Sequence, residues 1–490
     1  MRYISTRGAE KEGVSSAYAI KTGLASDGGL YMPLSIPTLS LNEILALAED
    51  DYPTRAAKIL SKYLSDYTEE ELLEDAKNAY STFYDFPAKV SDLGDTHMLE
   101  LWHGPTSAFK DMALQIMPRL FVRALRKCGE TRTAMILVAT SGDTGKAALE
   151  GYKDVEGTKI KVFYPIDGVS RVQKLQMQTQ LGDNVSVVGI VGNFDDAQNG
   201  VKRIFADKVM AAHLDSEGVF LSSANSINWG RLAPQIVYYV SAYCDMVKSG
   251  AIKLGDKIDV CVPTGNFGNI FACYLAKKMG LPVDKLICAS NKNNVLTDFF
   301  ESGVYDRNRA FHTTMSPSMD ILISSNLERL LYITLGTDKT AKYMSDLSTS
   351  GRYELSAEDF DLIKADFVGI YTDEDETAAT IKKLYNEKNC LIDTHTAVAM
   401  SATRKYMNIN KAERRILTVS TASAYKFATD VYASLTGERL DDLDALGMLN
   451  KLTGVEIPKP LYGIGERAVI FNESISKDDM DDSVRAFAKA

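Results

Sequence analysis

The sequence lacks the arrangement of cysteines that disulfide frameworks and zinc sites require. Its six cysteines are scattered along 490 residues, with no Cys-x-x-Cys pair and no regular spacing. Such a pattern is typical of reduced, mostly buried thiols. It argues against a disulfide-stabilised secreted domain and against a zinc site, and we predict no bound metal.

Long apolar runs are also missing. No uncharged apolar stretch approaches the ~20 residues that a membrane-spanning helix needs. The opening stretch, MRYISTRGAEKEG, has no apolar core of the kind that secretory signals carry. We therefore expect a cytoplasmic protein that has no membrane partner.

Positive charge is in deficit, because the formal net charge is −10 at pH 7. A chain of this sign does not attract nucleic acid or an anionic membrane through its overall field. An anionic small molecule must therefore be bound by a local cluster of donors. The hydrophobic fraction of 45% and the charged fraction of 24% are ordinary for a globular protein, and the length suggests two or three domains.

The texture of the chain changes near residue 95. Residues 38–90 predict helices, and Thr68 with Glu71 has capping-box spacing at the start of one of them. Further on, helical stretches alternate with short apolar runs at 133–140, 159–165, 185–192, 257–264, 285–291 and 414–421. Such runs are typical of parallel strands covered by helices on both faces. We predict an α/β fold with open, mostly parallel sheets and a mainly helical N-terminal segment.

Two later stretches give different signals. Residues 293–345 mix charge, proline and glycine, which favours an irregular or inserted region. A helix is predicted to open at Ser356, with Phe360, Ile363 and Phe367 on one face.

One lysine lies in an apolar helix start, GPTSAFKDMALQ. Phe109 precedes Lys110, and Ala113, Leu114 and Met117 follow at helical spacing. A lysine with such neighbours is expected to lie against a buried surface, where its ammonium form is disfavoured. A neutral lysine amine can attack an aldehyde and form a Schiff base. The alternative is a lysine whose stem covers apolar surface while its charge reaches water.

Three loops follow predicted strands, at the ends where open α/β sheets bind ligands. The first, SGDTGK from Ser141 to Lys146, offers N–H groups and hydroxyls at a helix start, which favours an anion. Its glycines are separated by only two residues and Ala147 follows Lys146, so the spacing excludes an ATP-binding P-loop. A plain tight turn between strand and helix is the alternative.

The other two loops are PTGNFGNI and STASAYKF. Two glycines free the backbone of PTGNFGNI to curl at a helix start, where the potential is positive. Thr421 offers one neutral hydrogen bond to a heterocycle, although a Ser/Thr-capped helix explains STASAYKF equally well. A buried lysine, a phosphate cradle, an anion-binding loop and a neutral hydroxyl are the parts that pyridoxal 5'-phosphate uses. The N–H groups that we predict to hold the cofactor phosphate belong to Gly265, Asn266, Phe267, Gly268 and Asn269.

These segments resemble the threonine synthases, pyridoxal-phosphate enzymes of fold type II, whose fold is like that of the tryptophan synthase β subunit. HGPTSAFKDMALQ is similar to the family's HGPT-x-AFKD segment, and this implies that Lys110 holds the cofactor. The resemblance also places Thr421 at the pyridine nitrogen. Further similar segments, in the family's order, are STRG, GLASDGGLYMP, ATSGDTGKAALEG, SSANSINWGRLAPQIVYY, PTGNFGNI, NKNNVLTDFF and TTMSPSMDILISSNLERLL.

The chain departs from the family near its C-terminal end. Where the family often has TAHPAKF, this chain has TASAYKF, so Ser423 and Ala424 replace a histidine and a proline. Any role of that histidine is therefore in doubt in this chain.

The resemblance implies that the protein converts O-phospho-L-homoserine and water to L-threonine and phosphate. The leaving phosphate needs its own donors. Arg231 suits a phosphate or carboxylate because of its guanidinium fork, although a surface arginine is the alternative. Our candidate donors are Ser141, Thr144, Asn225, Ser226 and Arg231.

Several neighbouring residues are expected to support the site without reacting. We predict structural roles for Asp143, His103 and His395, and simple packing for Asn228 and Trp229.

Two other functions stay open. One is a pyridoxal-phosphate phospho-lyase that releases phosphate and forms a 2-oxo acid, and the other is a non-enzymatic relative, against which the retention of Lys110 and GNFGN argues. We expect an N-terminal domain at 1–92 and a catalytic region at 93–490, with a smaller subdomain at about 130–215. The partner is predicted to be a small molecule, and the protein a monomer or homodimer.

Overall fold

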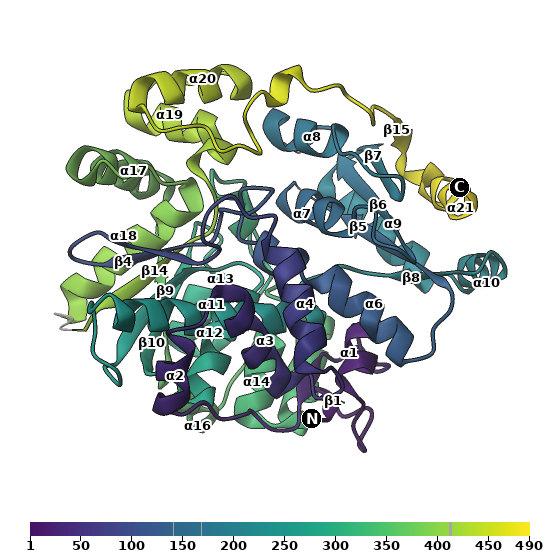
Figure 1. Ribbon diagram of the computed structural model, residues 1–490, viewed down its shortest axis with the longest axis horizontal. Helices are drawn as coiled ribbons and strands as arrows, with labels where there is room; N and C mark the ends of the chain where they lie inside the picture. Colours follow the sequence, from purple (N-terminus) through teal and green to yellow (C-terminus); the bar gives the residue numbers. More distant parts are fainter. Residues whose placement is uncertain (141, 168, 411–413) are drawn as a thin grey trace.

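The computed structural model describes residues 1–140, 142–167, 169–410 and 414–490. Helices flank two larger sheets, and two short two-stranded sheets complete the strand pairing (Figure 1). Within the described ranges we find no helix whose length and apolar character would let it span a bilayer. The two larger sheets and their flanking helices confirm the predicted α/β fold with mostly parallel sheets.

The N-terminal segment is mainly helical, as predicted. Thr68 accepts a hydrogen bond from the Glu71 N–H, and the Glu71 carboxylate accepts one from the Thr68 N–H, so the capping box is present. The helix that it opens buries Leu72 and Ala76 on one face. The elements of this segment are β1 (Tyr3–Ser5), α1 (Ser16–Thr22), β2 (Tyr31–Pro33), α2 (Leu41–Leu47), α3 (Tyr52–Tyr63) and α4 (Glu69–Tyr80).

The larger sheet has six strands in the order β13-β10-β9-β14-β4-β3. All neighbours are parallel except β3 and β4. Both faces are covered: Val260 and Val262 of β9 lie in the core with α11 and α12, whereas Cys261 packs with α18. The strands are β3 (Lys89–Asp92), β4 (His97–Glu100), β9 (Ile258–Pro263), β10 (Val283–Ser290), β13 (Phe367–Tyr371) and β14 (Ile416–Ser420), and the helices are α11 (Trp229–Lys248), α12 (Gly268–Met279) and α18 (Thr394–Asn410).

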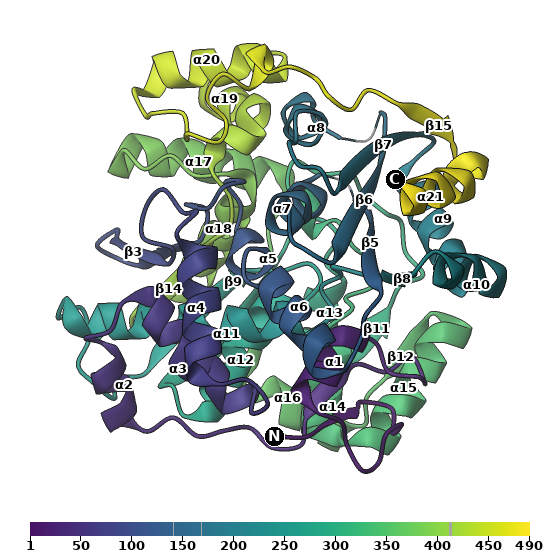
Figure 2. The ribbon, with the colours of Figure 1, turned by 45° about the vertical axis from the view of Figure 1, so that its right-hand side comes forward.

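The second sheet has five strands in the order β15-β7-β6-β5-β8, all of them parallel. Ile136 of β5 faces the main core with α6 and α7, and its neighbours Met135 and Leu137 face α9, α10 and α21 (Figure 2). The strands are β5 (Thr133–Ala139), β6 (Thr158–Pro165), β7 (Val185–Val191), β8 (Val219–Ser222) and β15 (Ser474–Ser476). The helices are α6 (Met117–Lys127), α7 (Asp143–Tyr152), α8 (Arg171–Gln178), α9 (Phe194–Ala206), α10 (Lys208–Ser216) and α21 (Met480–Lys489).

All six predicted strands are present, as β5, β6, β7, β9, β10 and β14. The prediction of an irregular region at 293–345 is correct mainly for residues 307–326, where the structure has a single 3₁₀ turn, and it is wrong for most of the rest, where for example Leu327, Leu330 and Leu331 are buried at helical spacing. This region contains α13 (Val295–Ser302), β11 (Val304–Asp306), the 3₁₀ turn η1 (Pro317–Met319), α14 (Leu327–Leu335) and most of α15 (Thr337–Ser350).

The helical assignment of Phe367 is also wrong. Helix α16 (Ala357–Lys364) ends before it, and Phe367 opens β13, where it pairs with Leu286 of β10. Sheet pairing with a distant strand therefore overrides the local helical pattern. The remaining elements are α5 (Asp111–Leu114), β12 (Arg352–Glu354), α17 (Glu374–Lys388), α19 (Ala428–Thr436), α20 (Asp442–Thr453) and the 3₁₀ turns η2 (Ala424–Phe427), η3 (Ile464–Glu466) and η4 (Lys477–Asp479).

Candidate active site

The segment that carries Lys110 is joined to the third predicted loop by backbone hydrogen bonds. The HGPTSAFK loop follows β4 and the STASAYKF loop follows β14, and these strands are parallel neighbours. The Phe109 N–H donates to the Thr421 carbonyl at 2.8 Å, and the Ser423 N–H donates to the Ser107 carbonyl at 3.1 Å. The start of the α5 helix (Asp111–Leu114) is therefore held against the end of β14.

The turn before Lys110 is organised by Asp111. Its carboxylate accepts hydrogen bonds from the N–H and the hydroxyl of Thr106, each at 2.8 Å. A Cβ at Gly104 would lie 2.5 Å from Asp111 Oδ2, so this position requires glycine. Burial raises the pKa of Asp111 to about 7. The Gly-Pro-Thr sequence thus forms a rigid turn that sets the position of Lys110.

Lys110 is buried, with 9% of its surface exposed, as the apolar neighbours predict. Its Nζ lies 3.4 Å from Ser318 Oγ and 3.5 Å from Asp143 Oδ2. Burial lowers the pKa of Lys110, and the charges of Arg231 and Lys426 lower it further, while Asp143 acts in the opposite direction. The alternative of a lysine whose charge reaches water is therefore excluded.

The SGDTGK loop connects β5 to α7. Ser141 lies outside the described residues, so its predicted contact with substrate cannot be placed. Thr140 Oγ1 accepts hydrogen bonds from the N–H groups of Gly142 and Gly145, at 3.0 and 2.9 Å. Thr144 is half-buried in the first turn of α7. The hydroxyl of Thr140 thus organises the backbone of this loop.

The PTGNFGNI loop forms the uncapped start of α12. The left-handed backbone conformation falls on Phe267, with φ 63°, and on neither glycine. A Cβ at Gly265 would lie 2.7 Å from the Ser318 carbonyl oxygen, whereas one at Gly268 would make an ordinary 3.4 Å contact with Asn326. Gly265 is therefore the glycine that close packing requires.

The helix start offers free donors. Within the part of the chain that the structure describes, no side chain caps α12. Asn269 is buried, its Oδ1 accepts from the Tyr239 hydroxyl at 2.6 Å, and its Nδ2 has no partner. Asn266 is exposed on the turn, and its carbonyl accepts from the Asn326 N–H at 3.1 Å. An anion at this place would meet unpaired N–H donors and the positive end of a helix.

Arg231 lies in α11 with 7% of its surface exposed, so the alternative of a surface arginine is wrong. Its Nη1 donates to the Ala224 carbonyl at 2.9 Å, and no carboxylate of the described chain forms an ion pair with it. Burial lowers its pKa to about 10. Of the neighbouring candidates, Asn225 is exposed and Ser226 is half-buried, and the Ser226 hydroxyl donates to Asn225 Oδ1 at 3.3 Å.

Thr421 is buried directly after β14, with 5% of its surface exposed. Two residues later, the Ser423 hydroxyl caps η2 by accepting from the Tyr425 N–H at 3.3 Å. In this chain the serine that replaces the expected histidine therefore stabilises the turn that carries Lys426.

The supporting residues have partners of their own. Asn228 caps α11, and Trp229 is fully buried against Tyr3. His103 forms a 2.7 Å hydrogen bond with Glu100. These contacts agree with the predicted structural roles.

His395 forms a 2.9 Å hydrogen bond with Asp393 through Nδ1, and its Nε2 accepts the Ser318 N–H at 3.0 Å. Nε2 is therefore unprotonated, and Nδ1 donates to Asp393. His395 therefore orients Ser318, and Ser318 in turn contacts Lys110.

Sequence reasoning missed the partnership of Lys426 with Asp143. Lys426 Nζ lies 2.9 Å from Asp143 Oδ1, and its side chain is fully buried. Burial alone would raise the pKa of Asp143, but the charges of Lys426 and Lys110 outweigh it and hold that pKa well below its usual range. Ser318 was missed as well, since it lies in the segment predicted to be irregular. No local pattern signals either contact, because the partners are far apart in sequence.

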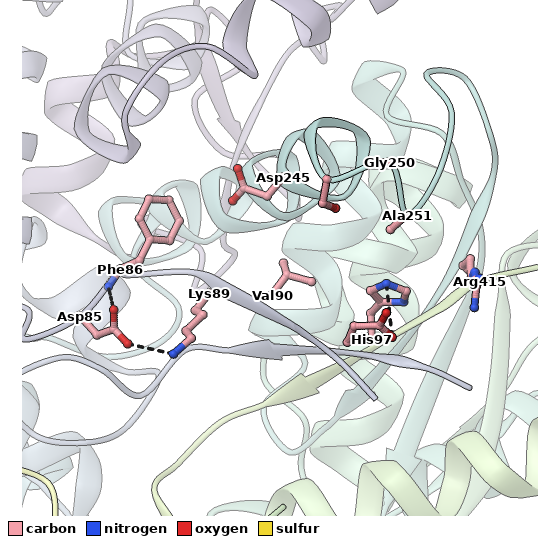
Figure 3. Close-up of a pocket in the computed structure, with 11 residues that line it drawn as sticks. Asp85, Phe86, Lys89, Val90, His97, Asp245, Gly250, Ala251 and Arg415 are labelled. Atoms are coloured by element: carbon pink, nitrogen blue, oxygen red, sulfur yellow. Dashed lines mark hydrogen bonds and ion pairs between the residues drawn. The ribbon is translucent and has the colours of Figure 1, made fainter. Parts of the chain in front are cut away.

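A surface pocket lies away from these loops, between the β3–β4 hairpin and the end of α11 (Figure 3). Its lining includes Lys89 with Asp85 at one end and His97 with Arg415 at the other. His97 is buried, and neither of its ring nitrogens has a hydrogen-bond partner among the residues that the structure describes. None of the predicted site residues that the structure describes lines this pocket.

The loop residues fit pyridoxal phosphate. Lys110 supplies a buried amine whose pKa is lowered, and this favours the neutral form that reacts with an aldehyde. The uncapped α12 and the unpartnered Nδ2 of Asn269 supply donors for a phosphate. Thr421 is buried directly after β14, and its carbonyl accepts a hydrogen bond from the N–H of Phe109, the residue before Lys110.

Comparison with known families agrees with this site. Residues 2–80 match the model of the threonine synthase N terminus, and residues 98–422 match that of the pyridoxal-phosphate-dependent enzymes. The second match includes Lys110, the SGDTGK and PTGNFGNI loops, and Thr421 at the start of the third loop.

Individual relatives extend the likeness along the chain. Threonine synthase of Pseudomonas aeruginosa is 38% identical over 448 residues, which is 89% of this chain and 91% of the relative. Human threonine synthase-like 1 is 40% identical over 454 residues, which is 89% of this chain and 60% of the relative. The chain thus spans about 60% of the length of the threonine synthase-like 1 proteins that it matches.

The fold is also shared with a solved structure. Pyridoxal-phosphate-bound threonine synthase from Brucella melitensis superposes with a TM-score of 0.89 at 35% identity, with all of each chain covered. The chain therefore belongs to the threonine synthase family of pyridoxal-phosphate-dependent enzymes.

Proposed function

We propose that this protein is a threonine synthase that converts O-phospho-L-homoserine and water to L-threonine and phosphate. The observation that carries the proposal is a surplus of buried positive charge in an acidic chain. Lys426 and Arg231 are buried cations, and Lys110 is a buried amine whose pKa is lowered. Asp143 pairs with Lys426, whereas no carboxylate within the described residues forms an ion pair with Arg231, so a phosphorylated substrate would balance the charge of that arginine.

The first anion is the phosphate of the cofactor. Donors for it are the N–H groups of residues 265–269, at the uncapped start of α12, together with the free amide of Asn269. Thr421 is proposed to meet the ring nitrogen with a neutral hydroxyl. Pyridoxal phosphate supplies an aldehyde that condenses with amines and a ring that takes up electrons.

The second anion is the phosphate of the substrate. Arg231 has no carboxylate partner in the described chain, so its guanidinium is available for phosphate oxygens. Thr144, Asn225 and Ser226 are proposed as further donors, and so is Ser141 on the strength of the sequence alone. These groups would stabilise the charge that develops on the phosphate as its bond to Cγ breaks.

Lys110 is the residue proposed to move protons. With the substrate amine in its place on the cofactor, the amine of Lys110 would be free to take the Cα proton. Its Nζ makes only long contacts with Ser318 and Asp143, which do not restrain it strongly. Loss of a Cβ proton, departure of phosphate from Cγ, protonation at Cγ, and addition of water at Cβ with return of a proton to Cα would complete the reaction.

The test is to incubate the purified protein with O-phospho-L-homoserine and to measure threonine and phosphate in parallel. Equal amounts of both products are expected, and Lys110→Ala should give neither. Lys208→Ala, an exposed change on α10, serves as the control. Phosphate with a 2-oxo acid in place of threonine would instead identify a phospho-lyase. Release of no product by the parent protein would favour a non-enzymatic relative.

Sheet composition and free cysteines support the proposed subdomains and a cytoplasmic location. The five-stranded sheet supports a smaller subdomain at about 130–215, following an N-terminal domain at 1–92, although β15 and α21 extend the smaller unit. All six cysteines, which lie within the described residues, are free thiols, as expected for a cytoplasmic protein. Either a monomer or a homodimer is consistent with the proposal.

A further inference from the structure

Two buried lysines share the carboxylate of Asp143, one on each oxygen. Oδ1 receives Lys426 Nζ at 2.9 Å and the amide of Gln173 at 2.8 Å. Oδ2 faces Lys110 Nζ at 3.5 Å and Ser318 Oγ at 3.4 Å. The contact to Lys426 is thus short and direct, whereas the contact to Lys110 is long.

Lys426 is held by three acceptors. Its Nζ donates to the Thr106 carbonyl at 3.0 Å and to Gln176 Oε1 at 3.1 Å, in addition to Asp143. An amine with three acceptors must carry three protons, so Lys426 is an ammonium ion. Its side chain is fully buried, and a charge in that position persists only if it is paired.

The partners of Lys426 connect the segments that build the site. Thr106 belongs to the turn before Lys110, Asp143 lies in the SGDTGK loop at the start of α7, and Gln176 lies in α8. Lys426 itself lies in η2 after β14. One ammonium group therefore fixes the carboxylate relative to the turn that carries Lys110.

We infer that Lys426 is a positioning residue that occupies the carboxylate of Asp143 so that the amine of Lys110 stays free to react with the cofactor aldehyde. The inference rests on the proposed role of Lys110 as the cofactor lysine. Condensation of an amine with an aldehyde forms one carbon–nitrogen double bond and releases one water, and only the neutral amine can begin it.

The charges that face Lys110 come from three elements. They are Asp143 of α7, Lys426 of η2 and Arg231 of α11. Without Lys426, one positive charge would be lost and Asp143 would have Lys110 as its remaining lysine partner. Both effects favour the ammonium form of Lys110, so capture of the aldehyde should require a higher pH.

The test measures capture of pyridoxal phosphate by the full chain after its own cofactor has been removed. The rate at which the visible absorbance of the bound cofactor appears is followed from about pH 6 to pH 10, which lies around and below the usual lysine pKa. Borohydride reduction and peptide mapping then identify the lysine that carries the cofactor. Thermal unfolding verifies that each variant is folded.

Lys426→Gln removes the charge but keeps a hydrogen-bond donor. Its capture midpoint should lie about one pH unit above that of the parent, so capture at neutral pH should be about tenfold slower. Asp143→Asn combined with Lys426→Gln removes both charges and should return the midpoint close to that of the parent. Should Lys426→Gln not fold, Lys426→Met, which leaves no polar group in the buried position, is measured in the same way.

A folded Lys426→Gln or Lys426→Met protein whose midpoint equals or falls below that of the parent would overturn the inference. A midpoint that stays high in the doubly substituted protein would overturn it too, because the effect would not pass through Asp143. Cofactor found on a lysine other than Lys110 in the parent would instead refute the site assignment under the proposed function. The assay uses no phosphohomoserine, so the two failures are distinguishable.

Discussion

Arg231 carries a buried charge that its surroundings balance only in part. One backbone carbonyl accepts from it at 2.9 Å, and the other guanidinium donors remain available for a bound anion. A bidentate phosphate would satisfy two of them at once. The buried guanidinium of Arg231 therefore favours binding of an anion, although the chain as a whole is acidic.

Arg231→Ala should lower kcat/KM for O-phospho-L-homoserine strongly. Truncation of one partner of a desolvated charge pair costs about 2–5 kcal/mol, which is roughly thirtyfold or more. The visible absorbance of the bound cofactor should be retained. Arg126→Ala is the control, since that side chain is 69% exposed on α6. Unchanged kinetics would remove Arg231 from the substrate site, and loss of the cofactor absorbance would assign it to the cofactor instead.

His97 should make the free energy of unfolding sensitive to acid. Burial lowers its pKa, and the charge of Asp92, 3.9 Å away, offsets this only in part. Since the unfolded value is about 6.5, the unfolded chain binds more protons than the folded chain as the pH falls through 6.5. The contribution of His97 to stability is therefore full above that pH and is lost below it.

Urea unfolding of the parent should show this loss on acidification, and His97→Gln should reduce it. His213→Gln, at a half-buried position of α10, is the matched control. An unaltered pH dependence in His97→Gln would show that other groups cause the acid sensitivity.

In the loop before α12, two glycines that look equivalent in the sequence have different surroundings. At Gly265 a Cβ would collide with the Ser318 carbonyl oxygen at 2.7 Å, and Ser318 in turn contacts Lys110. At Gly268 the same atom would meet Asn326 at 3.4 Å, an ordinary contact. The geometry of the cofactor loop thus depends on Gly265.

Gly265→Ala should weaken the binding of pyridoxal phosphate more than Gly268→Ala does. Overpacking at the first position should cost about 1–3 kcal/mol, because the loop has to move away from Ser318. Titration of each cofactor-free variant with pyridoxal phosphate gives the two dissociation constants. The reverse order would mean that the cofactor approaches Gly268 more closely than the loop approaches Ser318.

The elements also show which signals were readable in sequence. Apolar runs predicted six strands correctly, because strands with both faces covered need apolar side chains throughout. β4 was missed because its His-Met-Leu-Glu sequence is half polar, and its burial follows from pairing with β14 and β3. Phe367 was misassigned for a related reason, since its partner Leu286 is far away in the chain.

The candidate site could be predicted from the sequence where it depends on strand ends and glycines. The three loops and the buried Lys110 could be predicted because each has a local cause. The pair of Lys426 with Asp143 could not, because it joins η2 to α7 across the interior. The contact of Ser318 with Lys110 likewise depends on how a distant turn packs.

At the scale of the whole molecule, the five-stranded sheet is completed by a distant part of the chain. β15 pairs with β7, and α21 covers the face that α9 and α10 share (Figure 2). Met480 and Val484 of α21 are fully buried there. A Cβ at Gly200 of α9 would lie 2.3 Å from Met480 Sδ, so the two helices pack closely.

Met480→Ala should lower the free energy of unfolding by about 2–5 kcal/mol, as expected for a buried methionine. Ile470→Ala, at a residue that is 48% exposed, should change it by less than about 0.5 kcal/mol. Urea unfolding measures both. Deletion of residues 472–490 should in addition cause association of the protein, which light scattering detects, because the edge of β7 loses its cover. A Met480→Ala protein as stable as the parent would show that α21 contributes little.

The pairing of β15 with β7 can form only late in synthesis of the chain. A ribosome delivers β5 to β8 early, then every remaining strand of the six-stranded sheet, and only afterwards β15 and α21. Throughout that interval β7 is an open edge beside an uncovered apolar face, the state in which nascent chains are most prone to associate. Slow translation between β8 and β15 would lengthen the exposure, so the need of this protein for chaperones should depend on how quickly that stretch is made.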